Sequence, residues 1–298
     1  MGPESRRMAE YLEEQVWRGR IRFPVGEIHI METARIGSRR QRAELASIFC
    51  RFSGGWFLVS RQERTSTEID SALRTRLGCE PAGGSIFSVF TREMLLAFGD
   101  YPLLSTLLDR SPEQILSLAK KMGPFLSLIS YLEFEDEHVR RQAIERVTAM
   151  NRELIRGMLE RREQLIGSSK EMRRRVYSVT LFSQMYDKIY ASVLRLGGTL
   201  ESLRSLTAEQ LTTIIDDVPC FDIECRLAVK LEQQAKKVEE NDVFDIAALT
   251  AAVPYFDAVV TESFWVNLCK QSGVSSKYSA RLFSSLFQVC DWLKRGNA

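Results

Sequence analysis

The sequence predicts an α/β protein that is predominantly helical. Its N-terminal part has a helix–strand–helix order, with an apolar strand at residues 56–60. Residues 85–218 then show helical patterns with little strand signal. A β-branched run at residues 258–261 marks a short buried strand near the C-terminus. Helices that alternate with buried strands are typical of α/β domains.

The N-terminal part begins with a charged amphipathic helix and an extended segment at residues 21–25, where Pro24 disfavours helix for its predecessor. A later helix ends at Gly54-Gly55, because glycine tolerates the backbone of a helix C-terminus. The apolar strand that follows suits a parallel sheet buried on both faces. The expected elements are helices over residues 4–17, 26–35, 43–52 and 66–77 and a strand over residues 56–60.

The middle of the chain reads as a succession of helices. Ser111-Pro112-Glu113 and Thr207-Ala208-Glu209 are typical helix starts. Two long helices around residues 167–169 predict a helical hairpin, whose charged face interleaves arginines and glutamates. Such a face is usually solvated, and it could also contact RNA or a protein. The expected helices cover residues 92–98, 112–132, 135–165, 170–196 and 208–216.

Four acids lie in otherwise apolar sequence between Asn241 and Trp265. Asp242 and Asp245 open a helix that Pro254 stops, while Asp257 precedes and Glu262 follows the β-branched strand. Acids in these places can cap helices or lie in turns. They can also converge on a hard divalent cation, since ligands of open α/β sheets bind beyond the carboxyl ends of the strands. The surrounding elements are expected to be helices at 219–237, 264–271 and 286–295 and an edge strand at 281–284.

The same stretch resembles the later acidic motifs of the PIN-domain nucleases. The matching residues are Asp245 with Ile246-Ala247, then Val260-Thr261-Glu262, and a Pro254-Tyr255-x-Asp257 pattern of bacterial PIN-like proteins. The resemblance implies a PIN-like core with a parallel sheet. That core would be split between residues 1–84 and 218–298, with residues 85–217 as an all-helical insertion.

A second, weaker resemblance lies in the segment FPVGEIHIMET. It is similar to the second acidic motif of the same proteins, which implies that Glu32 faces the metal. His29, one turn earlier, could orient it or approach a phosphate, and Arg39 and Arg40 could follow phosphates nearby. The alternatives are that Glu32 is a solvated helix acid, that His29 is a histidine on a helix surface or partly buried, and that the arginines form a solvated helix face.

The first strand of a PIN domain and its Asp have no counterpart in the sequence before Phe23. Two explanations remain open: a start that lacks this strand, or a degenerate member that has lost the strand together with catalysis. In either case, the resemblance implies Glu32, Asp245, Asp257 and Glu262 as catalytic residues. Glu32, Asp245 and Glu262 among them would hold Mg²⁺ or Mn²⁺.

Bulk composition is that of a globular protein, with 45% hydrophobic and 27% charged residues among 298. A net charge of +2 neither requires nor excludes a polyanion. No Cys-x-x-Cys pair is present among the six cysteines, which argues against a zinc site and favours reduced thiols in a cytoplasmic protein. The longest apolar runs are too short to cross a bilayer, so no membrane partner is expected.

Two functions are compatible with these observations. The first is a Mg²⁺- or Mn²⁺-dependent endoribonuclease that hydrolyses phosphodiester bonds, with RNA as the substrate that the resemblance implies. The alternative is a non-catalytic interaction protein that binds a protein or RNA through its arginine-rich helices. Homo-oligomers are compatible with both.

Overall fold

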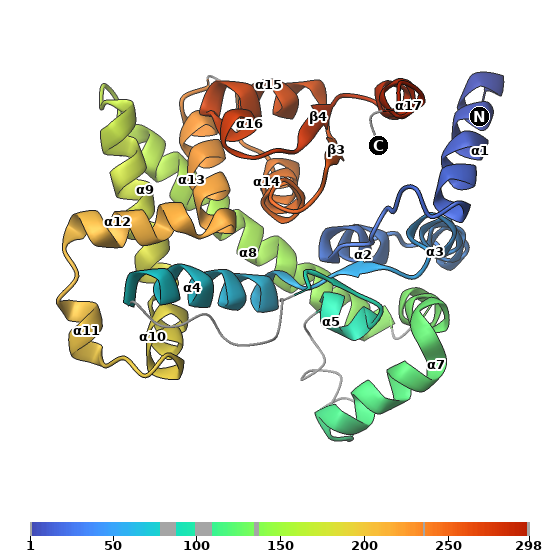
Figure 1. The fold of residues 1–298 in the computed structure, drawn as a ribbon, viewed down its shortest axis with the longest axis horizontal. Helices are drawn as coiled ribbons and strands as arrows, with labels where there is room; N and C mark the ends of the chain where they lie inside the picture. The colour runs from blue at the N-terminus through green and yellow to red at the C-terminus, as the bar shows by residue number, and fades with distance from the viewer. Residues whose placement is uncertain (1, 78–87, 99–108, 134–136, 235, 297–298) are drawn as a thin grey trace. The chain divides into compact units, whose positions relative to one another are not determined.

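The computed structural model describes residues 2–77, 88–98, 109–133, 137–234 and 236–296 (Figure 1). The chain divides into two compact units. Unit 1 comprises residues 1–63, 88–147 and 283–298, and unit 2 comprises residues 64–87 and 148–282. These boundaries differ from the expected division at residues 84/85 and 217/218, and the first of these positions lies outside the described residues.

Unit 1 is built from helices around two apolar clusters. One cluster gathers Val25, Ile30, Phe57 and Leu128 with their neighbours, and the other joins the first and last helices of the chain through Leu12 and Val289. Its elements are α1 (Pro3–Trp17), α2 (Glu27–Ala34), α3 (Arg39–Ser53), β1 (Phe57–Leu58), β2 (Phe90–Thr91), α5 (Met94–Phe98), α7 (Pro112–Glu133) and α17 (Leu286–Lys294).

Two local features of unit 1 follow directly from sequence. Ser38 caps α3 by accepting a hydrogen bond from the N–H of Gln41, and Gly54 ends the helix in a left-handed conformation with φ 58°. Within α7, Gly123 has φ 76° and precedes Pro124, so the helix is kinked there.

Unit 2 is organised around α13 (Pro219–Glu232), which packs against α9 (Lys170–Gln184), α12 (Ala208–Asp217), α14 (Glu240–Ala252) and α15 (Ser263–Ser272) (Figure 1). Its apolar side chains are buried almost throughout, including Phe221, Ile223 and Leu227. α9 and α12, which belong to the expected insertion, share this core with the C-terminal helices, and the division into core and insertion stays a prediction. The unit also contains α10 (Tyr186–Arg195), α11 (Leu200–Arg204), β3 (Ala258–Val260), α16 (Val274–Lys277) and most of β4 (Arg281–Phe283).

Two further helices, α4 (Arg61–Leu77) and α8 (Glu137–Gln164), run across unit boundaries in the sequence. In the part of the chain that the structure describes, no helix is both long and apolar enough to span a membrane.

The small sheets are the main departure from expectation. The sequence predicts a parallel sheet core, whereas the described residues form two two-stranded sheets, β1 with β2 and β3 with β4. β1 and β2 are antiparallel, and an isolated parallel bridge joins Val25 to Phe57. Strands of two or three residues offer little surface to a core, so helices supply nearly all of the buried apolar side chains.

Candidate functional site

The acidic stretch lies in unit 2 and spans α14, β3 and the start of α15. Asp242 and Asp245 lie in α14, Asp257 precedes β3, and Glu262 is the N-cap residue of α15. Pro254 follows the end of α14, as expected from its effect on helices. The sequence therefore placed the elements of this stretch correctly.

Asp242 has a structural role. Its buried carboxylate accepts a hydrogen bond from the backbone N–H of Glu239 at 2.8 Å, next to the first turn of α14. Its other oxygen accepts one from Nζ of Lys236 at 2.6 Å. The capping interpretation therefore holds for this residue.

Asp245 has a different environment. Oδ2 accepts a hydrogen bond from Nε1 of Trp265 at 2.7 Å, and the indole is buried. Desolvation raises the pKa of Asp245, and the negative charges of Glu262 and Asp242 raise it further, while the Trp265 hydrogen bond and the charge of Lys236 oppose this. The carboxylates of Asp245 and Glu262 are thus close enough to repel each other.

Asp257 and Glu262 have exposed side chains. The backbone carbonyl of Asp257 accepts from the N–H of Arg281 at 2.9 Å, which ties β3 to the start of β4. Glu262 caps α15 through its backbone carbonyl, which accepts from the N–H of Val266 at 3.0 Å, and its side chain makes no capping hydrogen bond. The carboxylate of Glu262 therefore takes no part in capping the helix and is exposed to solvent.

Tyr255, from the Pro254-Tyr255-x-Asp257 pattern, connects this stretch to α4. Its hydroxyl donates to Oε1 of Glu68, and Oε2 of the same acid accepts from the N–H of Cys220 at 2.8 Å. Desolvation and the charge of Glu68 raise the pKa of Tyr255, so the phenol stays protonated. The tyrosine therefore anchors the loop before β3.

Glu32 lies in α2 of unit 1, with an exposed side chain. The other three expected site acids lie in unit 2. Among the described residues of either unit, no three His, Cys, Asp or Glu side chains converge in a way that could hold a metal ion. The contribution of Glu32 to a common site stays a prediction.

His29 helps to begin α2. Its Nδ1 accepts a hydrogen bond from the N–H of Gly26 at 3.1 Å, and its ring lies 6.0 Å from that of Phe49. Desolvation of the ring lowers the pKa of His29, although the residue keeps an exposed edge. The imidazole is thus held neutral in a local cap, which is the role that a histidine at a helix N-terminus can play without any substrate.

Arg39 and Arg40 form ion pairs on the surface of unit 1. Arg39 lies 3.5 Å from Glu133, and Arg40 lies 2.8 Å from Glu44. Both arginines are largely exposed, and exposed pairs of this kind contribute little free energy. The expected contact of these side chains with phosphates would therefore have to displace only weak partners.

Several arginines near the turn of the predicted hairpin between α8 and α9 are engaged within unit 2, whereas Arg152 and Arg156 are 75% and 65% exposed in surface ion pairs. Arg161 pairs with the buried carboxylate of Glu232 at 3.0 Å, and Arg162 donates to two backbone carbonyls. Arg174 pairs with Asp216 at 2.6 Å and with Asp222 at 3.1 Å. These side chains hold α8 and α9 to α13, and this weakens the case for a solvated binding face there.

Asp222, in the first turn of α13, is a buried acid that none of the sequence patterns above singled out. It lies inside α13, fully buried, and accepts hydrogen bonds or ion pairs from Arg174, Arg226, Lys277 and Tyr278. Two signals could have identified it: an acid within the apolar run from Cys220 to Val229, and an arginine four residues later on the same helix face.

Comparison with known proteins adds no family to this description. The chain matches no protein-family model, no curated protein and no solved structure.

Proposed function

We propose that the protein is a PIN-like nuclease that hydrolyses phosphodiester bonds with a divalent cation held in part by Asp245 and Glu262. The observation that carries the proposal is the 2.7 Å hydrogen bond from Trp265 of α15 to Asp245, which brings Asp245 to the first turns of the helix that Glu262 begins. The charge of Glu262 contributes to the raised pKa of Asp245. Trp265 donates to Asp245 alone, and Lys236 offsets part of the negative charge there, so a cation near both carboxylates would stabilise the pair further.

The pair also fits the coordination chemistry of Mg²⁺ and Mn²⁺. Trp265 occupies Oδ2 of Asp245, while among the described residues Oδ1 of Asp245 and both oxygens of Glu262 accept no hydrogen bond. Mg²⁺ is commonly bound through one or two carboxylates, with waters and substrate phosphates as its other ligands. When bound, such an ion would activate water and offset charge on the phosphodiester.

The chain's own residues have three roles in this proposal. Trp265 fixes the rotamer of Asp245, the N-cap position fixes the backbone of Glu262, and Tyr255 anchors the loop that carries Asp257. Glu32 remains the additional acid that the family resemblance implies. RNA remains the implied substrate, and the PIN-like parallel sheet remains part of the proposal.

The test compares cation binding and cleavage in matched variants. Manganese(II) is expected to raise the melting temperature of the wild type and of Asp187→Asn, an exposed acid on α10 that serves as control. The rise should vanish in Asp245→Asn and Glu262→Gln, because each removes one ligand charge. The same two variants should lose Mn²⁺-dependent cleavage of a labelled single-stranded RNA.

Equal cleavage by the wild type and Asp245→Asn, or an equal rise in melting temperature, would refute the proposal. A Glu32→Gln variant tests the remaining acid: an unchanged response to Mn²⁺ would remove Glu32 from the site. Absence of any Mn²⁺ effect on the wild type would favour the interaction-protein alternative, which assigns the acids to caps and surfaces.

A further inference from the structure

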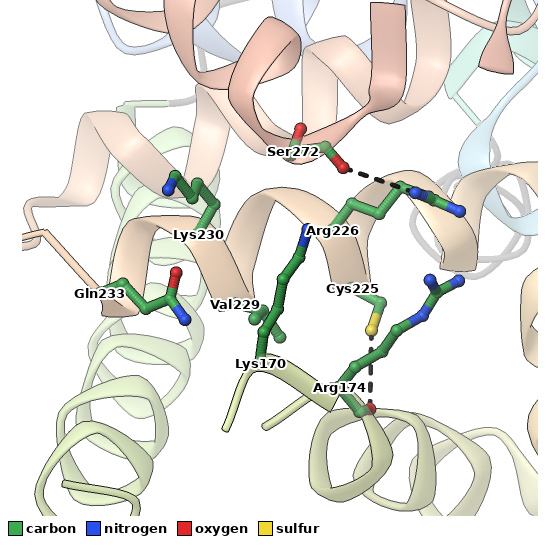
Figure 2. Close-up of a pocket in the computed structure, with 8 residues that line it drawn as sticks. All are labelled: Lys170, Arg174, Cys225, Arg226, Val229, Lys230, Gln233 and Ser272. Atoms are coloured by element: carbon green, nitrogen blue, oxygen red, sulfur yellow. Dashed lines mark hydrogen bonds between the residues drawn. The ribbon is translucent and has the colours of Figure 1, made fainter. Parts of the chain in front are cut away.

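A small pocket in unit 2 has a strongly basic lining. It lies where the first turns of α9 face the C-terminal half of α13 and the end of α15 (Figure 2). Its volume is about 20 Å³, which holds a group of about the size of one water, so it could receive an oxygen of a larger anion and cannot bury a base or a sugar. The residues that line it include Lys170, Arg174, Arg226, Lys230, Gln233 and Ser272.

The four basic residues of the pocket form two pairs, and each pair is separated by four residues on one helix. Lys170 and Arg174 are four residues apart on α9, and Arg226 and Lys230 are four residues apart on α13, so each pair lies on one helix face. Figure 2 shows Lys170 reaching from α9 towards α13, beside Arg226. No acid lines the pocket among the described residues.

The guanidinium groups of Arg174 and Arg226 are held by carboxylates outside the pocket. Asp222 binds Arg226 through both carboxylate oxygens, at 2.8 and 2.9 Å, and binds Arg174 at 3.1 Å. Arg174 is also held by Asp216, while its Nε is buried and has no hydrogen-bond partner among the described residues. The guanidinium groups are therefore preorganised, and Arg174 keeps an unused donor.

The two lysines are free to complete a site. The ammonium groups of Lys170 and Lys230 form no ion pair or hydrogen bond among the described residues, although the charge of Lys170 acts on the neighbouring Glu171. Five cationic side chains, with Lys277, thus meet two carboxylates around this pocket, and the excess is positive. Cys225, which also lines the pocket, adds no negative charge because burial raises the pKa of its thiol to about 12.

The geometry points to a binding site for a phosphate group, contributed by a phosphomonoester or by inorganic phosphate. Rigid guanidinium groups and mobile ammonium groups together match the several oxygens of a phosphate. Lys170 is the first residue of α9, a helix of 15 residues capped by Ser169, so the positive end of the helix dipole adds to the field. Ser272 contributes a carbonyl that is already used by Arg226, so it does not oppose the anion as a free acceptor.

The test is titration of inorganic phosphate and of adenosine 5′-monophosphate, followed by ³¹P line broadening in metal-free buffer at constant ionic strength. The double variant Lys170→Gln/Lys230→Gln removes two charges without touching the Asp222 network. Lys188→Gln, an exposed lysine on α10, is the matched control. Binding to the wild type and the control is expected to be at least about tenfold tighter than to the double variant.

The outcomes separate the sources of the ligand and separate this site from the nuclease proposal. Binding of both probes supports a general phosphate site, and a marked preference for the nucleotide supports a phosphomonoester. Equal affinity in the double variant and the control, or no broadening with either probe, overturns the inference. Asp245→Asn must bind phosphate as the wild type does, so a failed nuclease test leaves this result unaffected.

Discussion

Replacement of Asp222 by alanine is expected to destabilise unit 2 strongly. The carboxylate is fully buried and is shared by Arg174, Arg226, Lys277 and Tyr278. Removing one partner of a buried ion pair costs about 3–5 kcal/mol, since the remaining charge is left uncompensated. The arginine and lysine partners are 19–39% exposed, so water can reach them, and we expect the lower end of this range, about 3 kcal/mol.

The assay is urea unfolding followed by tryptophan fluorescence, to which unit 2 contributes Trp265, which is 1% exposed, and unit 1 the other three tryptophans. Far-UV circular dichroism provides a second probe, and the two transitions should coincide. Asp217→Ala is the matched control, because Asp217 pairs with Arg76 at 2.7 Å on the surface. This control should cost less than about 1 kcal/mol.

The free energies of unfolding of Asp222→Ala and Asp217→Ala are then compared. If Asp222→Ala lowers the free energy of unfolding no more than Asp217→Ala does, the buried network does not stabilise unit 2. Asp222→Asn then provides a finer test, because it keeps the shape and some hydrogen bonds while it removes the charge. It is expected to fall between the wild type and Asp222→Ala.

Three other predictions follow from single sites. Because the pKa of Asp245 is raised above the usual 3.8, the native state keeps this proton to a higher pH than the unfolded chain does. The free energy of unfolding should therefore fall as the pH rises from 3.8 through the pKa of the native state. Asp245→Asn should remove this slope and be at least as stable as the wild type at neutral pH without divalent cations, as thermal melts at several pH values can check. Gly55→Ala should cost about 1–2 kcal/mol in chemical unfolding, since Gly55 has φ 80° and an added Cβ would lie 3.0 Å from Pro124. Gly37→Ala, with no atom within 4 Å of its Cβ, should stay within about 0.5 kcal/mol, and equal costs would contradict this account. Arg42→Met should destabilise by more than about 1 kcal/mol in the same assay, because the buried guanidinium donates to three backbone carbonyls that would lose their partner.

Helices were the most predictable part of the fold. Ser38, Ser169 and Thr207 each accept a backbone hydrogen bond at a helix start, and these local signals are visible in sequence. The predicted helix over residues 170–196 instead breaks into α9 and α10 at Met185, whose φ and ψ of −102° and 7° leave the helical region. No glycine or proline marks this break, so only packing within unit 2 can produce it.

Strand signals were less informative about the sheet. The runs at residues 56–60 and 258–261 do contain β1 and β3, but each pairs with one short neighbour. A β-branched run reports that a segment is extended and buried, while the number and direction of its partners depend on residues far away in sequence. The parallel core was inferred from resemblance, and the local pattern alone did not require it.

The acids show most clearly which contacts can be predicted from a sequence and which cannot. Asp242 and Asp222 both occur near helix starts, yet one caps α14 and the other binds cations from α9, α13 and α16. Capping uses atoms within three residues, so sequence can predict it, whereas a buried ion cluster needs partners from distant helices. Asp245 lies three residues after Asp242 and bonds to Trp265, twenty residues later, rather than to its own helix end. Because of this hydrogen bond, Asp245 is not a capping residue of α14. Its negative charge lies near that of Glu262, and under the proposed function a bound cation would offset both charges.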